Sequence, residues 1–217
     1  MTSGHKVAVV FDLDGTLVDT MTSAPQAYVD TIRSLGGPDV SPSEVVAVWH
    51  IGPTPVVLEH FLGRPVAPDD TERFHHHFAA VVATVQPYPG VVRMLDALNR
   101  DGYRLGVFTT ATHRAATTML TATGLAGHFP VVVGGDDVSR PKPAPDGLEL
   151  SCRRLGTAVT EAVYVGDAAV DLQCADAANA SGIHAAWGSV NRTAAGPKRI
   201  AQRPHDVVEL VRHLQSQ

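Results

Sequence analysis

The sequence is poor in cysteine and in lysine. Only Cys152 and Cys174 occur in 217 residues, and they lie in unrelated contexts. Two such cysteines indicate buried or inert thiols in a reducing compartment, not a disulfide framework or a thiolate metal site. Lysine occurs only at Lys6, Lys142 and Lys198, so a lysine beside a charged motif stands out.

Long basic and long apolar stretches are also absent. The formal net charge is -5 without a basic block, which argues against a nucleic-acid partner. No apolar run approaches about 18 residues, so we expect no membrane span or membrane partner. The start, MTSGHK, has no apolar signal-peptide segment before Val7, and a cytoplasmic location is therefore expected.

Short apolar runs predict a buried parallel sheet. They are apolar at nearly every position, which is typical of strands covered on both faces. The five runs are Val7–Phe11, Leu105–Phe108, Val131–Val133, Ala162–Val165 and Ile183–Trp187. Helical patterns lie between most of them and at the end of the chain: Val91–Arg100, His113–Thr123, Asp146–Leu155, Val170–Ala180 and Asp206–Leu214. This order predicts an α/β fold, a Rossmann-like three-layer sandwich with a parallel sheet. Gly124 and Gly182 are expected to be left-handed residues that end helices.

One region breaks the strand–helix alternation. Between Asp19 and Gln86 the patterns predict only helices, at Met21–Leu35, Ser43–His50, Pro55–Leu62 and Asp70–Val85. We interpret residues 19–86 as an inserted, all-helical cap on a discontinuous core of residues 1–18 and 87–217. Pro87 and Pro89 stiffen the expected return to the core.

Polar residues follow the predicted strands at the point where each strand ends. They are Asp12 and Asp14, Thr109 and Thr110, Asp136 and Asp137, and Asp167 with Asp171. In open α/β sheets, ligands bind beyond the carboxyl ends of the strands. These side chains are therefore expected to meet at one edge of the sheet.

Clustered carboxylates need a positive partner. Two unit charges 4 Å apart repel by about 4 kcal/mol at an effective dielectric constant near 20. A bound cation, a lysine or a shared proton relieves such repulsion, and oxygen ligands favour Mg2+ over zinc. Lys142 lies in SRPKPAPD, where three prolines stiffen the backbone around a single positive charge.

Four motifs in order carry a resemblance to a known family. FDLDGTLVDT, FTTAT, SRPKPAPD and VGDAAVDL resemble the haloacid dehalogenase superfamily of aspartate-nucleophile phosphotransferases. The resemblance covers essentially the whole chain, including a helical cap after the first motif. GGDDVSRPKPAPD and YPGVVRMLDAL are most similar to the phosphoglycolate-phosphatase-like branch.

The resemblance implies a role for each aspartate of the first and last motifs. Asp12 would be the nucleophile that forms an aspartyl-phosphate, and Asp14 the general acid and base. Asp12, the backbone carbonyl of Asp14, and Asp167 would bind Mg2+, with Asp171 supporting the metal directly or through water. From its position alone, Asp171 could instead be a surface helix residue.

The resemblance also implies a phosphate-binding group. The Thr109 and Thr110 hydroxyls, Lys142 and the backbone turn at Gly15 would bind phosphoryl oxygens. Thr16 would shape this turn near the substrate. Thr109 could instead cap the helix that follows it, because threonine is common at that position.

The implied activity is Mg2+-dependent hydrolysis of a small phosphomonoester resembling phosphoglycolate. Asp14 speaks against a dehalogenase, which lacks the second aspartate. The cap contains no lysine, which speaks against a phosphonatase. Substrate contacts are predicted at the cap segment HIGPT, from His50, Gly52 and Thr54.

Other functions stay open as alternatives. A sugar phosphomutase of the β-phosphoglucomutase type shares the DxD motif, although none of Arg33, Arg64 and Arg73 is clearly placed for a second phosphate. A receiver domain carries its phosphorylated aspartate at a later strand and has no inserted helices. A non-catalytic, metal-binding interaction protein would not need the complete set of charged motif residues.

Overall fold

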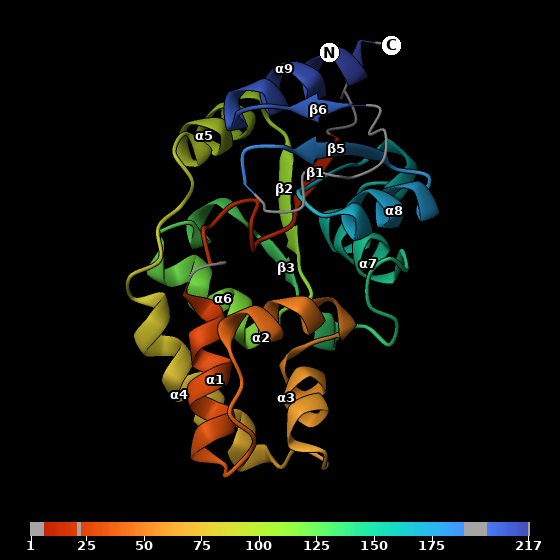
Figure 1. The fold of residues 1–217 in the computed structure, drawn as a ribbon. Coiled ribbons are helices and arrows are strands. Elements are labelled where there is room, and N and C mark those ends of the chain that lie inside the picture. The colour runs from red at the N-terminus through yellow and green to blue at the C-terminus, as the bar shows by residue number, and fades with distance from the viewer. Residues whose placement is uncertain (1–6, 21–22, 189–198, 217) are drawn as a thin grey trace.

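A computed structural model describes residues 7–20, 23–188 and 199–216 (Figure 1). Its core is a six-stranded parallel sheet with strand order β3-β2-β1-β4-β5-β6. The strands are β1 (Ala8–Phe11), β2 (Arg104–Phe108), β3 (Val131–Val133), β4 (Val163–Gly166), β5 (Ser181–Ala185) and β6 (Ile200–Ala201). The predicted α/β class with a parallel sheet is confirmed.

Helices cover both faces of the sheet, as its continuous apolar strands require. They are α5 (Val91–Asp101), α6 (His113–Ala122), α7 (Asp146–Leu155), α8 (Ala169–Ala177) and α9 (Pro204–Gln215). Val9 and Phe11 of β1 pack into one core cluster with α5, α6 and α9, whereas Ala8 and Val10 pack into another with α7 and α8. Successive strand residues point to opposite faces, which produces the three layers.

In the described chain, four α-helices follow β1 before the chain returns to the core at α5: α1 (Ala24–Ser34), α2 (Pro42–Val48), α3 (Thr54–Leu62) and α4 (Pro68–Val82). They gather at one end of the sheet (Figure 1). Tyr28 and Phe74 join α1 to α4 with ring centroids 4.5 Å apart. Met21 and Thr22 of the predicted cap lie outside the described residues, and the domain boundaries stay a prediction.

An ion pair crosses from the cap to the core. The Arg114 guanidinium of α6 donates two hydrogen bonds to the Glu72 carboxylate of α4. Within the described ranges, no helix combines the length and apolar character needed to cross a membrane.

Several local predictions need correction. The strand β6 was not predicted, because two residues carry too little pattern to be recognised. Gly124 has the expected left-handed φ of 72°, but Gly182 lies in β5, and Asn179 takes a left-handed φ of 55° after α8. The last helix before β5 therefore ends earlier than its apolar pattern indicated.

Candidate active site

The first motif forms a tight turn directly after β1. The Asp12 backbone N–H donates to the Val165 carbonyl at 2.8 Å, which continues the sheet by one residue. Leu13 is fully buried, so the side chains on either side of it project away from the core. Gly15 has φ 77°, and a Cβ there would lie 2.7 Å from Asp167 Oδ2, so this turn requires glycine.

Lys142 lies between two of the aspartates. Its Nζ is 2.8 Å from Asp12 Oδ1 and 2.7 Å from Asp171 Oδ1. Burial alone would lower the pKa of the Lys142 ammonium, but the adjacent carboxylates raise it well above its usual value. Lys142 also lies over the Phe108 and Tyr164 rings, at 5.3 and 5.6 Å from their centroids.

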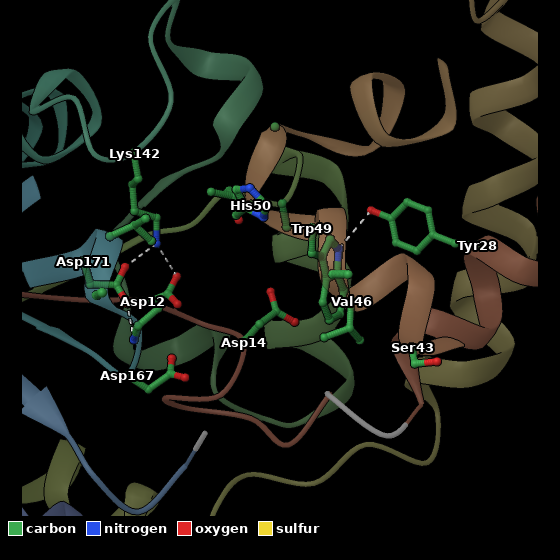
Figure 2. A pocket seen from close by; sticks show the side chains of 17 residues that line it. Asp12, Asp14, Tyr28, Ser43, Val46, Trp49, His50, Lys142, Asp167 and Asp171 are labelled. Atoms are coloured by element: carbon green, nitrogen blue, oxygen red, sulfur yellow. Dashed lines mark hydrogen bonds and ion pairs between the residues drawn. The ribbon is translucent and has the colours of Figure 1, made fainter. Parts of the chain in front are cut away.

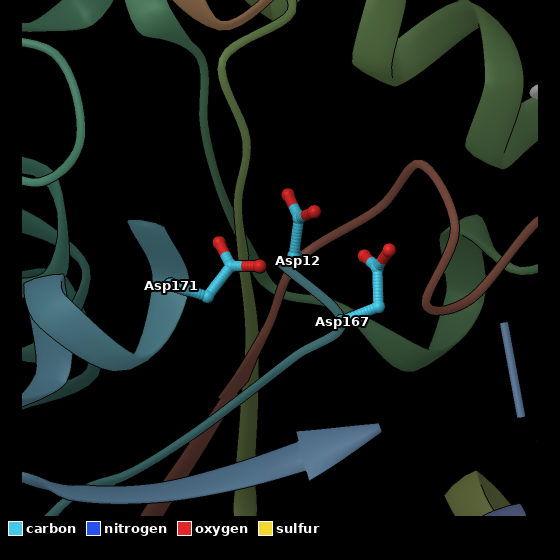
Figure 3. Close-up of side chains that lie close together, drawn as sticks. All are labelled: Asp12, Asp167 and Asp171. Atoms are coloured by element: carbon cyan, nitrogen blue, oxygen red, sulfur yellow. The ribbon is translucent and has the colours of Figure 1, made fainter. Parts of the chain in front are cut away.

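Three buried carboxylates converge at the strand ends (Figure 3). Asp12, Asp167 and Asp171 each offer one oxygen, and these oxygens all lie within 4.8 Å of one another. Burial raises the pKa of the Asp12 carboxyl well above its usual value, the other two carboxylates add to this, and Lys142 opposes it. One lysine leaves an excess of negative charge, and a cation with oxygen ligands fits this surplus.

Asp167 and Asp171 also accept hydrogen bonds from neighbouring groups. Asp167 accepts a 3.0 Å hydrogen bond from the Thr16 hydroxyl. Asp171 accepts from Lys142 at one oxygen and from the Ala168 backbone N–H at the other, at 3.0 Å. Asp171 is only 1% exposed, so it is not a surface helix residue.

Asp14 reaches the cavity from the same turn. It is half-buried, and its carboxylate accepts a hydrogen bond from the Thr20 hydroxyl. Burial raises the pKa of the Asp14 carboxyl, and the Thr20 hydrogen bond opposes this rise.

The threonines after β2 have separate positions. Thr110 lines the cavity, whereas Thr109 is buried and its hydroxyl accepts a 3.2 Å hydrogen bond from the Ala111 N–H. The residue that caps α6 is Thr112, not Thr109. Asp136 accepts a hydrogen bond from the backbone N–H of His113, the first residue of α6.

A cavity of about 650 Å³ lies between the strand ends and the cap. Figure 2 shows Asp12, Asp167, Asp171 and Lys142 on one side, and Tyr28, Ser43 and Val46 on the other. Of the predicted cap residues, His50 and Gly52 line this cavity.

Thr54 does not line the cavity. Its hydroxyl is buried and forms a 3.0 Å hydrogen bond with the Tyr28 hydroxyl. Thr54 therefore packs behind the residues that line the cavity, and the prediction that it contacts the substrate is wrong for this structure. The Trp49 indole N–H donates to the same Tyr28 hydroxyl at 3.4 Å. Burial raises the pKa of Tyr28 to about 12, so this hydroxyl remains protonated.

Among the described cap residues, five that line the cavity were not predicted: Tyr28, Ser43, Val46, Ala47 and Trp49. The aromatic residue next to His50 was the available signal for one of them. The other four reach the cavity through helix packing, which the sequence pattern does not specify.

Comparison with known families identifies the architecture around this cavity. The family described as haloacid dehalogenase-like hydrolase matches residues 9–185, which include every motif discussed above. The chain belongs to the haloacid dehalogenase-like hydrolases. The predicted superfamily is therefore confirmed.

Named relatives of this hydrolase agree with that assignment. The phosphoglycolate phosphatase of Aquifex aeolicus (strain VF5) is 29% identical, over 94% of this chain and 95% of its own. A plasmid-encoded phosphoglycolate phosphatase of Cupriavidus necator is 34% identical, over 79% of this chain and 77% of its own. The structure of CbbY from Rhodobacter sphaeroides in complex with phosphate has a TM-score of 0.81 at 25% identity, over 92% of this chain and 95% of CbbY. These findings confirm the predicted enzyme class, a hydrolase of phosphoric monoesters.

The two cysteines take no part in this site. Cys152 and Cys174 are buried free thiols, as predicted, and burial raises the pKa of each to about 12. Such thiols remain protonated and unreactive at neutral pH.

Proposed function

We propose that this hydrolase is a Mg2+-dependent phosphatase that cleaves a small phosphomonoester through an aspartyl-phosphate on Asp12. The observation that carries the proposal is the convergence of Asp12, Asp14 and Lys142 on one cavity, with Asp12 hydrogen-bonded to Lys142. This reaction needs three groups: a nucleophile, a separate proton donor and a positive charge at the phosphoryl position. Asp12, Asp14 and Lys142 would supply them in that order.

The first step transfers the phosphoryl group to Asp12. A carboxylate oxygen of Asp12 forms a bond to phosphorus while the bond from phosphorus to the ester oxygen breaks. The departing alkoxide takes a proton from Asp14. Asp14 lies two residues beyond the nucleophile and lines the same cavity, which supports this assignment.

The second step regenerates the enzyme. Asp14, now ionised, takes a proton from water, whose oxygen attacks phosphorus. The bond between phosphorus and the Asp12 oxygen breaks, inorganic phosphate leaves, and Asp12 returns to its carboxylate form. Asp14 thus serves as acid and then as base.

Lys142 and the neighbouring backbone stabilise the phosphoryl oxygens in this proposal. The ammonium is fixed by two carboxylates, so little reorganisation is needed when negative charge develops. Thr110 and the turn at Gly15 supply further donors. Thr109 acts either through its own hydroxyl or by holding the backbone at Ala111.

The acidic cluster would hold the Mg2+. The proposed ligands are Asp12, Asp167 and the backbone carbonyl of Asp14. Asp171 would support the metal through water, or indirectly by holding Lys142 through their hydrogen bond. A bound Mg2+ supplies positive charge that offsets the charge of the carboxylates and the phosphoryl group. Calorimetric titration of the protein with Mg2+ tests this without reference to activity, since Asp167→Asn is expected to weaken binding.

The residues of the cap favour hydrolysis over phosphomutase activity. A phosphomutase must bind a second phosphate, and in the described part of the cap no arginine lines the cavity. Arg33 pairs with Asp39 at 3.4 Å, and Arg64 pairs with Asp70 at 2.6 Å.

A panel of phosphomonoesters with and without Mg2+ tests the proposed function. Phosphoglycolate belongs in the panel because the relatives carry its name. We expect Mg2+-dependent phosphate release that Asp12→Asn abolishes and that the matched exposed-site control Asp19→Asn retains. Near-normal turnover by Asp12→Asn would contradict the assignment.

A further inference from the structure

Among the described cap residues that line the cavity there is no lysine, arginine, aspartate or glutamate. Val46, Ala47 and Trp49 present apolar groups to it, and Ser43 and Tyr28 add hydroxyls. In the described cap residues, neither lysine nor arginine lines the cavity, and His50 is its sole titratable base there. Of the described residues that line the cavity, the fixed positive charge is Lys142, which already pairs with two carboxylates.

A carboxylate or a second phosphate on the leaving group would meet this wall without a fixed counter-charge. Moving an anion out of water into such a site is unfavourable unless it is paired and hydrogen-bonded. The charge distribution thus disfavours an anionic leaving group.

The cavity is also large. Its volume of about 650 Å³ falls within the roughly 300–1,000 Å³ that is usual for sites holding drug-sized ligands. A phosphoryl group with a two-carbon acid fills only a small part of this space. A bulkier leaving group would displace water from the apolar surfaces that remain.

The aromatic part of the wall is held in place. The Trp49 indole N–H donates to the Tyr28 hydroxyl, and the two rings meet edge to face with centroids 6.1 Å apart. Tyr28 is fixed in turn by Thr54 and by the Phe74 ring. A rigid aromatic surface of this kind binds an apolar ring with little loss of conformational freedom.

We propose that the preferred substrate is the phosphate monoester of an uncharged, ring-bearing alcohol whose ring packs against Trp49 and Val46. This inference rests on the proposed phosphatase function and specifies its substrate class. The phosphate lies at Asp12 and Lys142, and the alcohol extends toward α2 and the short 3-10 turn Trp49–Ile51.

Two matched pairs of substrates test the two parts of the inference. Phosphoglycolate and its carboxamide differ in charge, whereas ethyl phosphate and 2-phenylethyl phosphate differ in the ring. All four esters are assayed at the same pH. We expect kcat/KM to favour the carboxamide and the phenylethyl ester, each by about tenfold or more.

Two substitutions on the cap provide an independent check. Ala47→Arg adds a cation at an exposed position of the wall and is expected to shift the charge preference about tenfold toward phosphoglycolate. Ala80→Arg, at an exposed position of α4 that does not line the cavity, is the matched control and should leave the preference unchanged. Trp49→Leu should reduce the preference for 2-phenylethyl phosphate over ethyl phosphate.

The outcomes separate this inference from the function beneath it. A preference for phosphoglycolate over its carboxamide, or no preference for the phenyl ring, would overturn the inference while leaving the phosphatase intact. An unchanged charge preference in Ala47→Arg would also count against it. Absence of Mg2+-dependent hydrolysis of all four esters would overturn the proposed function and this inference with it.

Discussion

Lys142 Nζ lies 2.7 Å from Asp171 Oδ1, and both side chains are almost completely buried. Asp171 also accepts from the Ala168 N–H, so both of its oxygens already have donors. We therefore expect Asp171 to act chiefly by holding Lys142 in place, whereas Asp167 is the proposed metal ligand.

This relationship predicts different effects for the two aspartates. Asp171→Asn should lower kcat by about 10–100-fold, as loss of a supporting partner usually does, and should change the Kd for Mg2+ little. Asp167→Asn should raise that Kd substantially. Asp176→Asn, an exposed position of the same helix as Asp171, is the control. Calorimetry and steady-state kinetics decide, and equal losses of Mg2+ affinity would contradict the distinction.

Asp14 should matter most when the leaving group needs a proton. For an alkyl phosphate, Asp14→Asn is expected to lower kcat by about 10²–10⁴-fold, the usual contribution of general acid–base catalysis. For p-nitrophenyl phosphate the loss should be smaller, because nitrophenolate departs without protonation. Comparing kcat for the two esters measures this difference. An identical loss on both would argue that Asp14 is not the acid.

The hydrogen bond between Tyr28 and Thr54 should couple the contributions of these two residues to the stability of the cap. Tyr28→Phe leaves the buried Thr54 hydroxyl without this partner and should lower the free energy of unfolding by about 1–3 kcal/mol. Adding Thr54→Val should recover part of the loss, because both partners are then apolar. Denaturant unfolding of the two single variants and the double variant gives the coupling. If the losses in unfolding free energy of the two single variants simply add in the double variant, the two residues are not coupled and the prediction is wrong.

Asp70 should make cap stability depend on pH. A hydrogen bond from Arg64 and another from the Ala67 N–H hold the pKa of the Asp70 carboxyl below its usual value. A lowered folded-state pKa contributes stability above the unfolded-state pKa, and this contribution is lost as pH falls through the folded-state value. Asp70→Asn should thus lower Tm at pH 7, and this effect should shrink as pH falls below the ordinary aspartate pKa of about 3.9. Asp69→Asn, on the same helix, is the control, and a pH-independent loss would refute the titration.

The sequence predicted the parts of the site that depend on local chain order. Asp12, Asp14 and Asp167 follow strands directly, and the parallel sheet brings their positions to one edge whatever the rest of the chain does. The conformation of Gly15 was predictable for a similar reason, because its turn is confined to a few residues.

The cap wall could not be predicted in the same way. Tyr28 and Trp49 meet only after three helices have packed, and Thr54 faces Tyr28 instead of the cavity for the same reason. The hydrogen bond between Lys142 and Asp171 joins residues 29 positions apart in the chain, and the sequence pattern did not predict it either. The helical pattern predicts which residues are apolar, not which of them line a cavity between two packed units.

The central claim is that Asp12 carries the phosphoryl group, and the stereochemistry at phosphorus tests it most directly. The substrate is a phosphorothioate ester made chiral with oxygen isotopes and hydrolysed in isotopically labelled water. Each in-line displacement inverts phosphorus, so transfer to Asp12 followed by transfer to water predicts net retention of configuration. Net inversion would show a single direct attack by water and would contradict the account.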